Sequence, residues 1–235
     1  MEIIMQINKQ KILIIADHQD NEMLGCGGTI KKLALQNNEI FIAILSEDIT
    51  SRSDTRAKGL KNKVLKKMPQ YVSKEHKALN VTKTFLFNLP DNRFDSLNLL
   101  DIIKIIESLI TTIQSTIIFT HNQYDLNIDN QITYQAVLTA CRPPKFPKTN
   151  TIYTFEILSS TEWNYPQKFI PNVYVNITDT IEYKLKTMSA YKSEIENWPH
   201  PRSLEGIKIL ADKKGSEICI SYAEAFQLIR KNLLS

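Results

Sequence analysis

The stretch that decides the fold is ADHQDNEMLGCGGT, residues 16–29. The short apolar run before it, residues 11–16, is rich in isoleucine, and apolar residues recur at near-helical spacing from Leu24 onward. The pattern predicts a strand, a polar turn and a helix that packs on the sheet. Because ligands of open α/β sheets bind beyond the carboxyl ends of the strands, we expect a functional site at this turn.

The turn groups ionisable side chains closely. His18, Asp20 and Glu22 lie close together in the sequence, with Asn21 among them. Such a group is costly unless its members bind a metal or transfer protons, which indicates a site. For Glu22 a second interpretation has equal weight, because an acidic side chain also stabilises the positive N-terminus of a helix.

Three glycines follow the turn, namely Gly25, Gly27 and Gly28. Their spacing does not satisfy the G-x-G-x-x-G pattern of phosphate-binding loops. We therefore expect them to allow close packing between the helix and the sheet.

Strand and helix patterns alternate along the rest of the chain. Strand patterns lie at 39–45, 83–89, 116–120, 151–158 and 173–177, and helix patterns at 99–113, 131–141, 181–195, 204–212 and 222–231. This alternation predicts an α/β fold, with a Rossmann-like, mostly parallel sheet and helices on both faces. No repeat or clear linker interrupts it, so we expect a single domain over residues 1–235.

Composition narrows the function further. The chain of 235 residues is 43% hydrophobic and carries a net charge of +4, which suits one α/β core. The only dense lysine run, residues 58–67, would not form a single stripe on a helix, so we expect no nucleic-acid partner. An anionic, phosphate-bearing substrate or a membrane surface stays open.

Cysteine usage and hydropathy indicate the cellular compartment of the protein. Three widely separated cysteines fit a reducing cytosol and offer no cysteine zinc site. The N-terminal residues are too interrupted for a signal peptide, and no apolar run is long enough to span a membrane. We expect a soluble, cytoplasmic protein.

The turn resembles that of the PIG-L (LmbE-like) de-N-acetylases, zinc enzymes that remove acetyl groups from N-acetylglucosamine-type sugars. Their usual motif is A-H-P-D-D-E before a glycine-rich helix start. In the family, the His and the second Asp bind zinc, and the first Asp is the general base. Aligned on the His, the resemblance implies that His18 is a zinc ligand and Asp20 the base, while Asn21 occupies the second ligand position.

A second segment, THNQYDLNIDN at residues 120–130, resembles the family pattern T-H-x-x-x-D-x-N-x-D-H, whose closing His is the third zinc ligand. In this chain Asn130 occupies that position. Four further stretches, 89–95, 155–163, 199–203 and 223–226, resemble bacterial members in the same order. On these motifs the chain is identified as a member of the family from about residue 11 to about residue 230.

The resemblance implies metal-assisted hydrolysis of an amide. The metal would lower the pKa of a bound water and polarise the acetyl carbonyl. Asp20 would take the proton of the water and later return one to the leaving amine, while His121 would stabilise the oxyanion or act as the acid. The expected partner is an amino sugar or a glycan precursor, and the sequence is compatible with a homo-oligomer.

Arginines are candidates to hold hydroxyl or phosphate groups of the sugar, because the guanidinium presents a rigid fork of donors. The expected substrate-binding set is Glu22, Arg52, Arg56, Asn92, Arg93, Asp125, Asp129, Trp163 and His200. For His200, between two prolines, we favour a place at the border of the pocket over a capping role.

The two asparagines predict a degenerate zinc site. An amide oxygen is a weak, neutral ligand, and Asn21 and Asn130 fill two of the three ligand positions. A shifted shell of His18, Asp20, His121 and Asp129 is one rescue, although it would consume the base. Weak coordination by Asn21 is another. Two further hypotheses are a metal-free pseudoenzyme that binds a sugar, and a metal-independent enzyme in which Asp20 and His121 form an acid/base pair.

The region 59–78 has an undecided structure. Its lysine-rich sequence fits both a helix and a lid over the pocket. We expect His76, within this stretch, to be solvated.

Overall fold

The computed structural model describes residues 9–47, 76–143, 145 and 148–232. Within these residues, seven strands form one sheet in the order β3-β2-β1-β4-β5-β7-β6. The strands are β1 (Lys11–Ala16), β2 (Glu39–Ser46), β3 (Lys83–Leu89), β4 (Ile117–His121), β5 (Thr151–Phe155), β6 (Val173–Asn176) and β7 (Ala223–Lys231). Strands β1 to β5 pair in parallel, while β7 runs antiparallel to β5 and β6. The predicted α/β fold with a mostly parallel sheet is confirmed.

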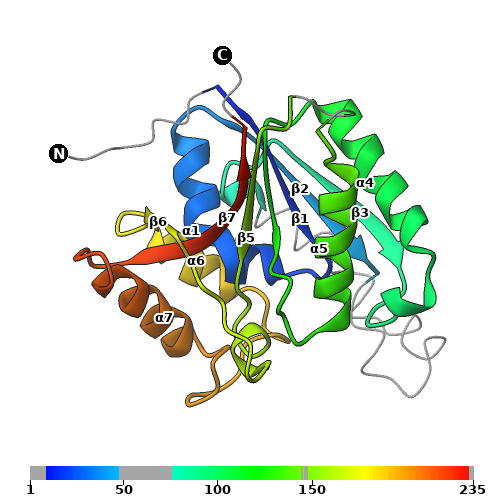
Figure 1. Cartoon of the computed structure of the whole chain (residues 1–235). Coiled ribbons are helices and arrows are strands. Elements are labelled where there is room, and N and C mark those ends of the chain that lie inside the picture. Colours follow the sequence, from blue (N-terminus) through cyan, green and yellow to red (C-terminus); the bar gives the residue numbers. More distant parts are fainter. Residues whose placement is uncertain (1–8, 48–75, 144, 146–147, 233–235) are drawn as a thin grey trace.

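Helices cover both faces of the sheet (Figure 1). They are α1 (Asn21–Leu35), α4 (Leu99–Ile113), α5 (Ile128–Ala140), α6 (Ile181–Met188) and α7 (Leu204–Ser216), with short 3-10 turns η3 (Phe94–Ser96) and η4 (Thr161–Trp163). Helices α4 and α5 lie on one face, and α1, α6 and α7 lie on the other. None of the helices described is long and apolar enough to cross a membrane.

Alternation along the central strands explains the two cores. Ile12, Ile14 and Ala16 of β1 pack with residues of α1, whereas Leu13 and Ile15 pack with α4 and α5. Successive side chains of a strand point to opposite faces, so a strand buried on both sides is apolar throughout. This is why the short isoleucine-rich run predicts a central strand.

The strand order changes direction at β1. The chain runs outward from β1 through β2 to β3, and then returns to place β4 on the other side of β1. The loops that follow β1 and β4 therefore diverge at a topological switch point, where open α/β sheets bind their ligands. Residues 17–20 and 122–127 occupy these two loops.

The predicted helix at 222–231 is wrong, because Ala223–Lys231 forms strand β7. Its sequence suits a helix, but its backbone pairs with β5 on one side and β6 on the other. Tertiary pairing of this kind overrides local propensity. Two other predicted elements are too long, since β5 ends at Phe155 and α6 ends at Met188.

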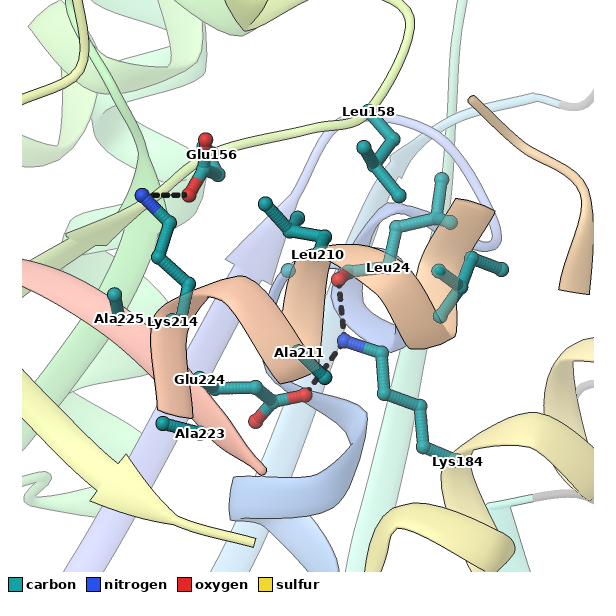
Figure 2. A pocket seen from close by; sticks show the side chains of 12 residues that line it. Leu24, Glu156, Leu158, Lys184, Leu210, Ala211, Lys214, Ala223, Glu224 and Ala225 are labelled. Carbon is teal, nitrogen blue, oxygen red and sulfur yellow. Dashed lines mark hydrogen bonds and ion pairs between the residues drawn. The ribbon is translucent and has the colours of Figure 1, made fainter. Parts of the chain in front are cut away.

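Helix α1 is broken at Cys26, whose backbone is non-helical at φ −148° and ψ 23°. A buried ion pair fills the break (Figure 2). Nζ of Lys184 lies 2.6 Å from Oε1 of Glu224 and donates to the Leu24 carbonyl at 2.7 Å. The Glu224 carboxylate accepts the backbone N–H groups of Gly28 at 3.0 Å and Thr29 at 2.7 Å. The pair thus caps both halves of the helix.

Close packing of α1 on the sheet depends on Gly25. A Cβ atom at this position would lie 2.3 Å from the Phe155 ring of β5. The expectation that glycine permits close packing between this helix and the sheet is confirmed at this position.

Candidate active site

Asp17 is the centre of a buried polar cluster at the switch point. It directly follows β1 and has no exposed surface. Its Oδ1 accepts the backbone N–H of His18 at 2.7 Å and the side-chain amide of Asn21 at 2.8 Å. Nε2 of His121, at the end of β4, lies 2.9 Å from the same oxygen. Asp17 therefore connects the first turn of α1 to the end of β4.

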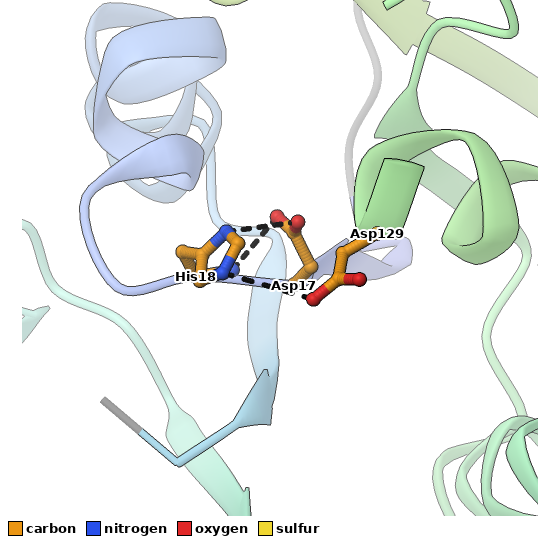
Figure 3. A group of neighbouring side chains, drawn as sticks. All are labelled: Asp17, His18 and Asp129. Carbon is orange, nitrogen blue, oxygen red and sulfur yellow. Dashed lines mark hydrogen bonds and ion pairs between the residues drawn. The ribbon is translucent and has the colours of Figure 1, made fainter. Parts of the chain in front are cut away.

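His18 lies among three carboxylates. Its Nδ1 is 2.9 Å from Oδ2 of Asp17, and its Nε2 is 2.6 Å from Oδ1 of Asp91 and 3.9 Å from Oδ2 of Asp129. Figure 3 shows the interactions that join the ring to Asp17 and to Asp129. Burial alone would lower the pKa of His18, but the charge and hydrogen bonds of Asp17, joined by Asp91, raise this pKa well above 6.5. In the absence of a bound cation, these carboxylates favour the protonated form of His18.

The Asp17 carboxyl responds in the opposite sense. Burial would raise its pKa, but the charges of His18 and His121, with their hydrogen bonds, lower the pKa well below 3.8. Asp17 therefore stays ionised in this cluster.

Asp129 faces His18 from the first turn of α5. Its Oδ1 accepts the backbone N–H of Phe94 at 2.9 Å, whereas its Oδ2 has no hydrogen-bond partner. Burial, supported by the charge of Asp17, raises the pKa of Asp129 to about 6. The side chain of Asn127 caps α5 by accepting the Asp129 N–H, which fixes the position of this residue.

The two asparagines at the family ligand positions lie side by side. Nδ2 of Asn21 is 3.5 Å from Oδ1 of Asn130, and both residues are buried. Oδ1 of Asn21 has no hydrogen-bond partner. The structure thus brings Asn21 and Asn130 together, and Asp17 joins Asn21 to His18.

The cluster fits a divalent cation. Asp17, His18 and Asp129 each offer one ligand atom, and these atoms lie within 4.8 Å of one another. Imidazole nitrogen and carboxylate oxygen are common ligands of Zn²⁺, and carboxylates also suit Mn²⁺. The unpartnered oxygens of Asp129 and Asn21 are the kind of buried acceptor that a cation would satisfy.

Asp20 begins α1 in a strained conformation. Its φ of 99° is left-handed, and its side chain is buried. Strain of this kind in a residue other than glycine is typical of functional sites. Its Oδ2 lies 3.2 Å from Nη1 of Arg202, which also approaches Glu194 at 3.6 Å. Burial raises the pKa of Asp20 well above 3.8, although the Arg202 charge opposes the shift.

Arg202 joins Asp20 to the loop after β5. Its Nε donates to the Leu158 carbonyl at 3.2 Å and to Oγ of Ser159 at 2.7 Å. Further along this loop, the exposed Trp163 ring meets the ring of His200 edge to face at 5.9 Å. Trp163 follows β5 and His200 precedes α7, so the ring contact and Arg202 both join these two loops.

The other predicted substrate residues are dispersed. Asp125 is buried and accepts hydrogen bonds from Ser160 and Thr161. Asn92 and Arg93 are exposed beside Asp91. Arg52 and Arg56, with residues 59–75 of the undecided region, lie outside the described part of the chain.

The prediction that His76 is solvated is wrong. The residue is 1% exposed, with Nε2 2.9 Å from Oε1 of Glu22 and Nδ1 2.7 Å from Oγ1 of Thr84. Its lysine-rich neighbours suggested a solvated surface, but the buried Glu22 carboxylate needs a partner. Glu22 also lies 3.4 Å from the Tyr191 hydroxyl and accepts the Asp20 N–H, which supports a role in shaping the turn.

Sequence reasoning missed Asp17, Asp91 and Arg202 as members of the site. Asp17 directly follows β1, so the strand-end rule alone could have found it. Asp91 and Arg202 both lie in stretches that resemble the family.

A Rossmann-like sheet with a polar cluster at its switch point defines a ligand-binding α/β protein. The PIG-L family, described as GlcNAc-PI de-N-acetylase, matches residues 13–141. The chain belongs to this family, and this membership supports its place among the amide hydrolases of the de-N-acetylase class. None of the curated proteins matches the chain by sequence.

Solved structures share the fold over almost the whole chain. N,N'-diacetylchitobiose deacetylase from Pyrococcus horikoshii is 21% identical, with a TM-score of 0.75 over 94% of this chain and 84% of that one. A conserved protein from Thermus thermophilus is 17% identical, with a TM-score of 0.73 over 96% of this chain and 97% of that one. GalB of Pseudomonas putida KT2440, a 4-carboxy-2-hydroxymuconate hydratase, is 16% identical, with a TM-score of 0.74 over 96% and 98%. Because the fold also carries a hydratase, function must be argued from the site.

Proposed function

We propose that this protein hydrolyses the amide bond of an N-acyl amino sugar, such as an N-acetylglucosamine derivative, in the cytoplasm. The observation that carries the proposal is Asp20, a buried and strained carboxylate at the switch point. Its pKa is raised well above 3.8, mainly by burial. A carboxyl group with a pKa moved towards neutrality is suited to accept a proton and to return it. Membership of the PIG-L family supports this chemistry.

Each group has a distinct part in the proposed reaction. A divalent cation, when bound by the cluster, supplies an acidified water and polarises the acyl carbonyl. Asp20 takes the proton of the attacking water and delivers one to the leaving amine. His121 has no exposed surface and lies against Asp17, which supports a positioning role in which it holds Asp17 in place.

The surroundings suit a sugar. Trp163 is 43% exposed and its ring meets that of His200, two residues before Arg202. An exposed aromatic face can cover the apolar side of a sugar ring, while a polar edge stays in water. Arg93 and Asn92 are exposed and follow Asp91 in the sequence, which supports a role in binding hydroxyl or phosphate groups.

A metal-free function is the second candidate, and one observation favours it. His18 contacts both Asp17 and Asp91, and the charge balance of this arrangement is satisfied by a proton. In that form the pocket would bind a sugar without hydrolysing it, or would use Asp20 for metal-independent proton transfer.

The test is release of a free amine from a panel of N-acetylated amino sugars, followed with an amine-reactive fluorophore. We expect the natural chain to release amine and the Asp20→Asn variant to lose this activity. The control variant Asp95→Asn changes an exposed carboxylate and should keep the activity. Activity that persists in Asp20→Asn would contradict the proposed base. Sugar binding without amine release, by the natural chain supplied with zinc, would favour the metal-free candidate.

A further inference from the structure

We propose that the cation is held by Asp17, His18 and Asp129, and that Asn21 and Asn130 position this shell without ligating. The inference rests on the proposed function and names the ligands of the same site. It differs from a weakened version of the family site, because two carboxylates replace the two positions that hold amides.

The two carboxylates share one arrangement. In Asp17, Oδ1 accepts two hydrogen bonds, from the His18 N–H and the Asn21 amide. In Asp129, Oδ1 accepts the Phe94 N–H. Oδ2 of Asp129 has no hydrogen-bond partner, and Oδ2 of Asp17 meets only the His18 ring, although both residues are fully buried.

Each carboxylate is thus anchored through one oxygen, while the other faces the same imidazole. Oδ2 of Asp17 is 2.9 Å from Nδ1 of His18, and Oδ2 of Asp129 is 3.9 Å from Nε2 (Figure 3). A buried oxygen without a donor is costly unless a ligand completes it. The unpartnered Oδ2 of Asp129, grouped with Oδ2 of Asp17 around one imidazole, points to a cation.

Asn21 fits this shell better than an aspartate would. Its Nδ2 donates to Oδ1 of Asp17 at 2.8 Å, whereas a carboxylate at position 21 would set two negative oxygens at that distance. The carboxylate that the family motif has at position 21 is therefore supplied from position 17. The amide of Asn21 orients the ligand as an outer-shell group does.

The assignment also leaves Asp20 free. A shell that used Asp20 as a ligand would lose the base, but Asp20 contacts Arg202 and is not among the three grouped ligand residues. Two carboxylates and one neutral imidazole balance the charge of a divalent ion. Because the donors are one nitrogen and two oxygens, we expect Zn²⁺ and Mn²⁺ both to bind.

The experiment is calorimetric titration of the untagged, chelator-treated full chain with Zn²⁺ and separately with Mn²⁺. Asp17→Asn and Asp129→Asn each remove one ligand oxygen, and Asn130→Ala is the matched control next to Asp129. Outer-shell changes typically cost roughly 10–100-fold in metal affinity. We therefore expect each aspartate variant to lose more than about 100-fold, and Asn130→Ala to lose no more than the roughly 10–100-fold of an outer-shell change. Unfolding of each metal-free variant, followed by circular dichroism, establishes that it folds.

Several results would overturn the assignment. One is that the natural chain binds neither ion. Another is that a folded Asp129→Asn or Asp17→Asn variant keeps the metal affinity of the natural chain. A third is that Asn130→Ala loses as much metal affinity as the aspartate variants. Its failure is distinguishable from that of the proposed function. Amine release that persists with chelator present would support the hydrolase function and refute the metal site. Metal binding without amine release would support the metal site and refute the hydrolase function.

Discussion

Two groups of buried charges lie along helix α1, and they differ in how well their polar atoms are satisfied. At the break of the helix, both oxygens of Glu224 accept backbone N–H groups, and Lys184 contacts Glu224 and the Leu24 carbonyl. At the start of the helix, Oδ2 of Asp129 and Oδ1 of Asn21 have no hydrogen-bond partner.

On the proposed function, the difference separates charges that hold the fold together from charges that would bind a ligand. A buried ion pair with all its partners present holds the two halves of α1 together, and nothing is left to bind a ligand. The cluster around Asp17 keeps unsatisfied acceptors and a strained residue, Asp20, at a small cost in stability. Proteins accept such costs where a site must meet a ligand.

The largest expected effect is on the satisfied pair. Glu224→Ala leaves Lys184 buried without its partner and uncaps Gly28 and Thr29, so we expect the free energy of unfolding to fall by about 3–5 kcal/mol. Urea denaturation measures the loss. Glu217→Ala removes an exposed ion pair with Lys213 and should cost less than about 1 kcal/mol. Equal losses in the two variants would show that the buried pair has no special role.

A second substitution tests the packing of α1 on the sheet. It lies on the helix between the two groups of buried charges. Gly25→Ala would bring a Cβ to 2.3 Å from the Phe155 ring and should destabilise by about 1–3 kcal/mol. Gly27→Ala is the control, since its nearest contact, Lys184 Cγ at 3.4 Å, is ordinary. Thermal unfolding compares them, and Phe155→Leu should partly rescue Gly25→Ala. A tolerated Gly25→Ala would refute the close packing.

Removal of a charge from the unsatisfied cluster should stabilise the protein, whereas removal of Glu224 should destabilise it. The pKa of Asp129 is raised from 3.8 to about 6, so the folded state binds the proton more tightly than the unfolded chain. Stability therefore decreases as the pH rises from 3.8 to about 6. Without metal, Asp129→Asn should raise the free energy of unfolding by about 1–3 kcal/mol at neutral pH, and the gain should vanish in acid below both pKa values.

Asp125→Asn, in the loop just before α5, is the matched change. The Asp125 carboxylate accepts hydrogen bonds from Ser160, Thr161 and the Asn127 N–H. In Asp125→Asn, the new NH₂ group would point at one of these donors and could not accept its hydrogen bond. We expect a loss of about 1–3 kcal/mol. Denaturation of both variants at neutral pH and in acid decides the matter. Destabilisation by Asp129→Asn at neutral pH would mean that its carboxylate is structural.

The smallest expected effect concerns the base. Arg202→Met removes the charge that opposes the raised pKa of Asp20, so this pKa should rise further. The acid limb of kcat/KM should then move to higher pH, because more of Asp20 is protonated at a given pH. Arg202→Lys keeps the charge and should shift the limb less. A limb that stays in place in Arg202→Met would remove Asp20 from the base role.

Much of the fold follows from local sequence. Periodicity alone predicts β1, β2, β3 and α4 close to their observed bounds, because each is apolar on the surface it buries. Strand β7 could not be predicted in this way. Its pairing with β5 and β6 depends on residues far away in the sequence.

The site was predictable in place but not in detail. The strand-end rule identifies the turn after β1, and the asparagines at 21 and 130 do lie together. The sequence could not show that Asp17 joins His18, Asn21 and His121, since these contacts span up to 104 positions. The role of His76 was hidden for the same reason, because its partner Glu22 lies 54 positions away.

The most direct test is anomalous diffraction from crystals of the protein soaked in Zn²⁺. We predict one strong peak within coordination distance of Asp17 Oδ2, one ring nitrogen of His18 and Asp129 Oδ2, about 2.0–2.2 Å from each. A peak coordinated by Asn21 and Asn130 in place of the two aspartates, or no peak at the switch point at saturating Zn²⁺, would contradict the assignment.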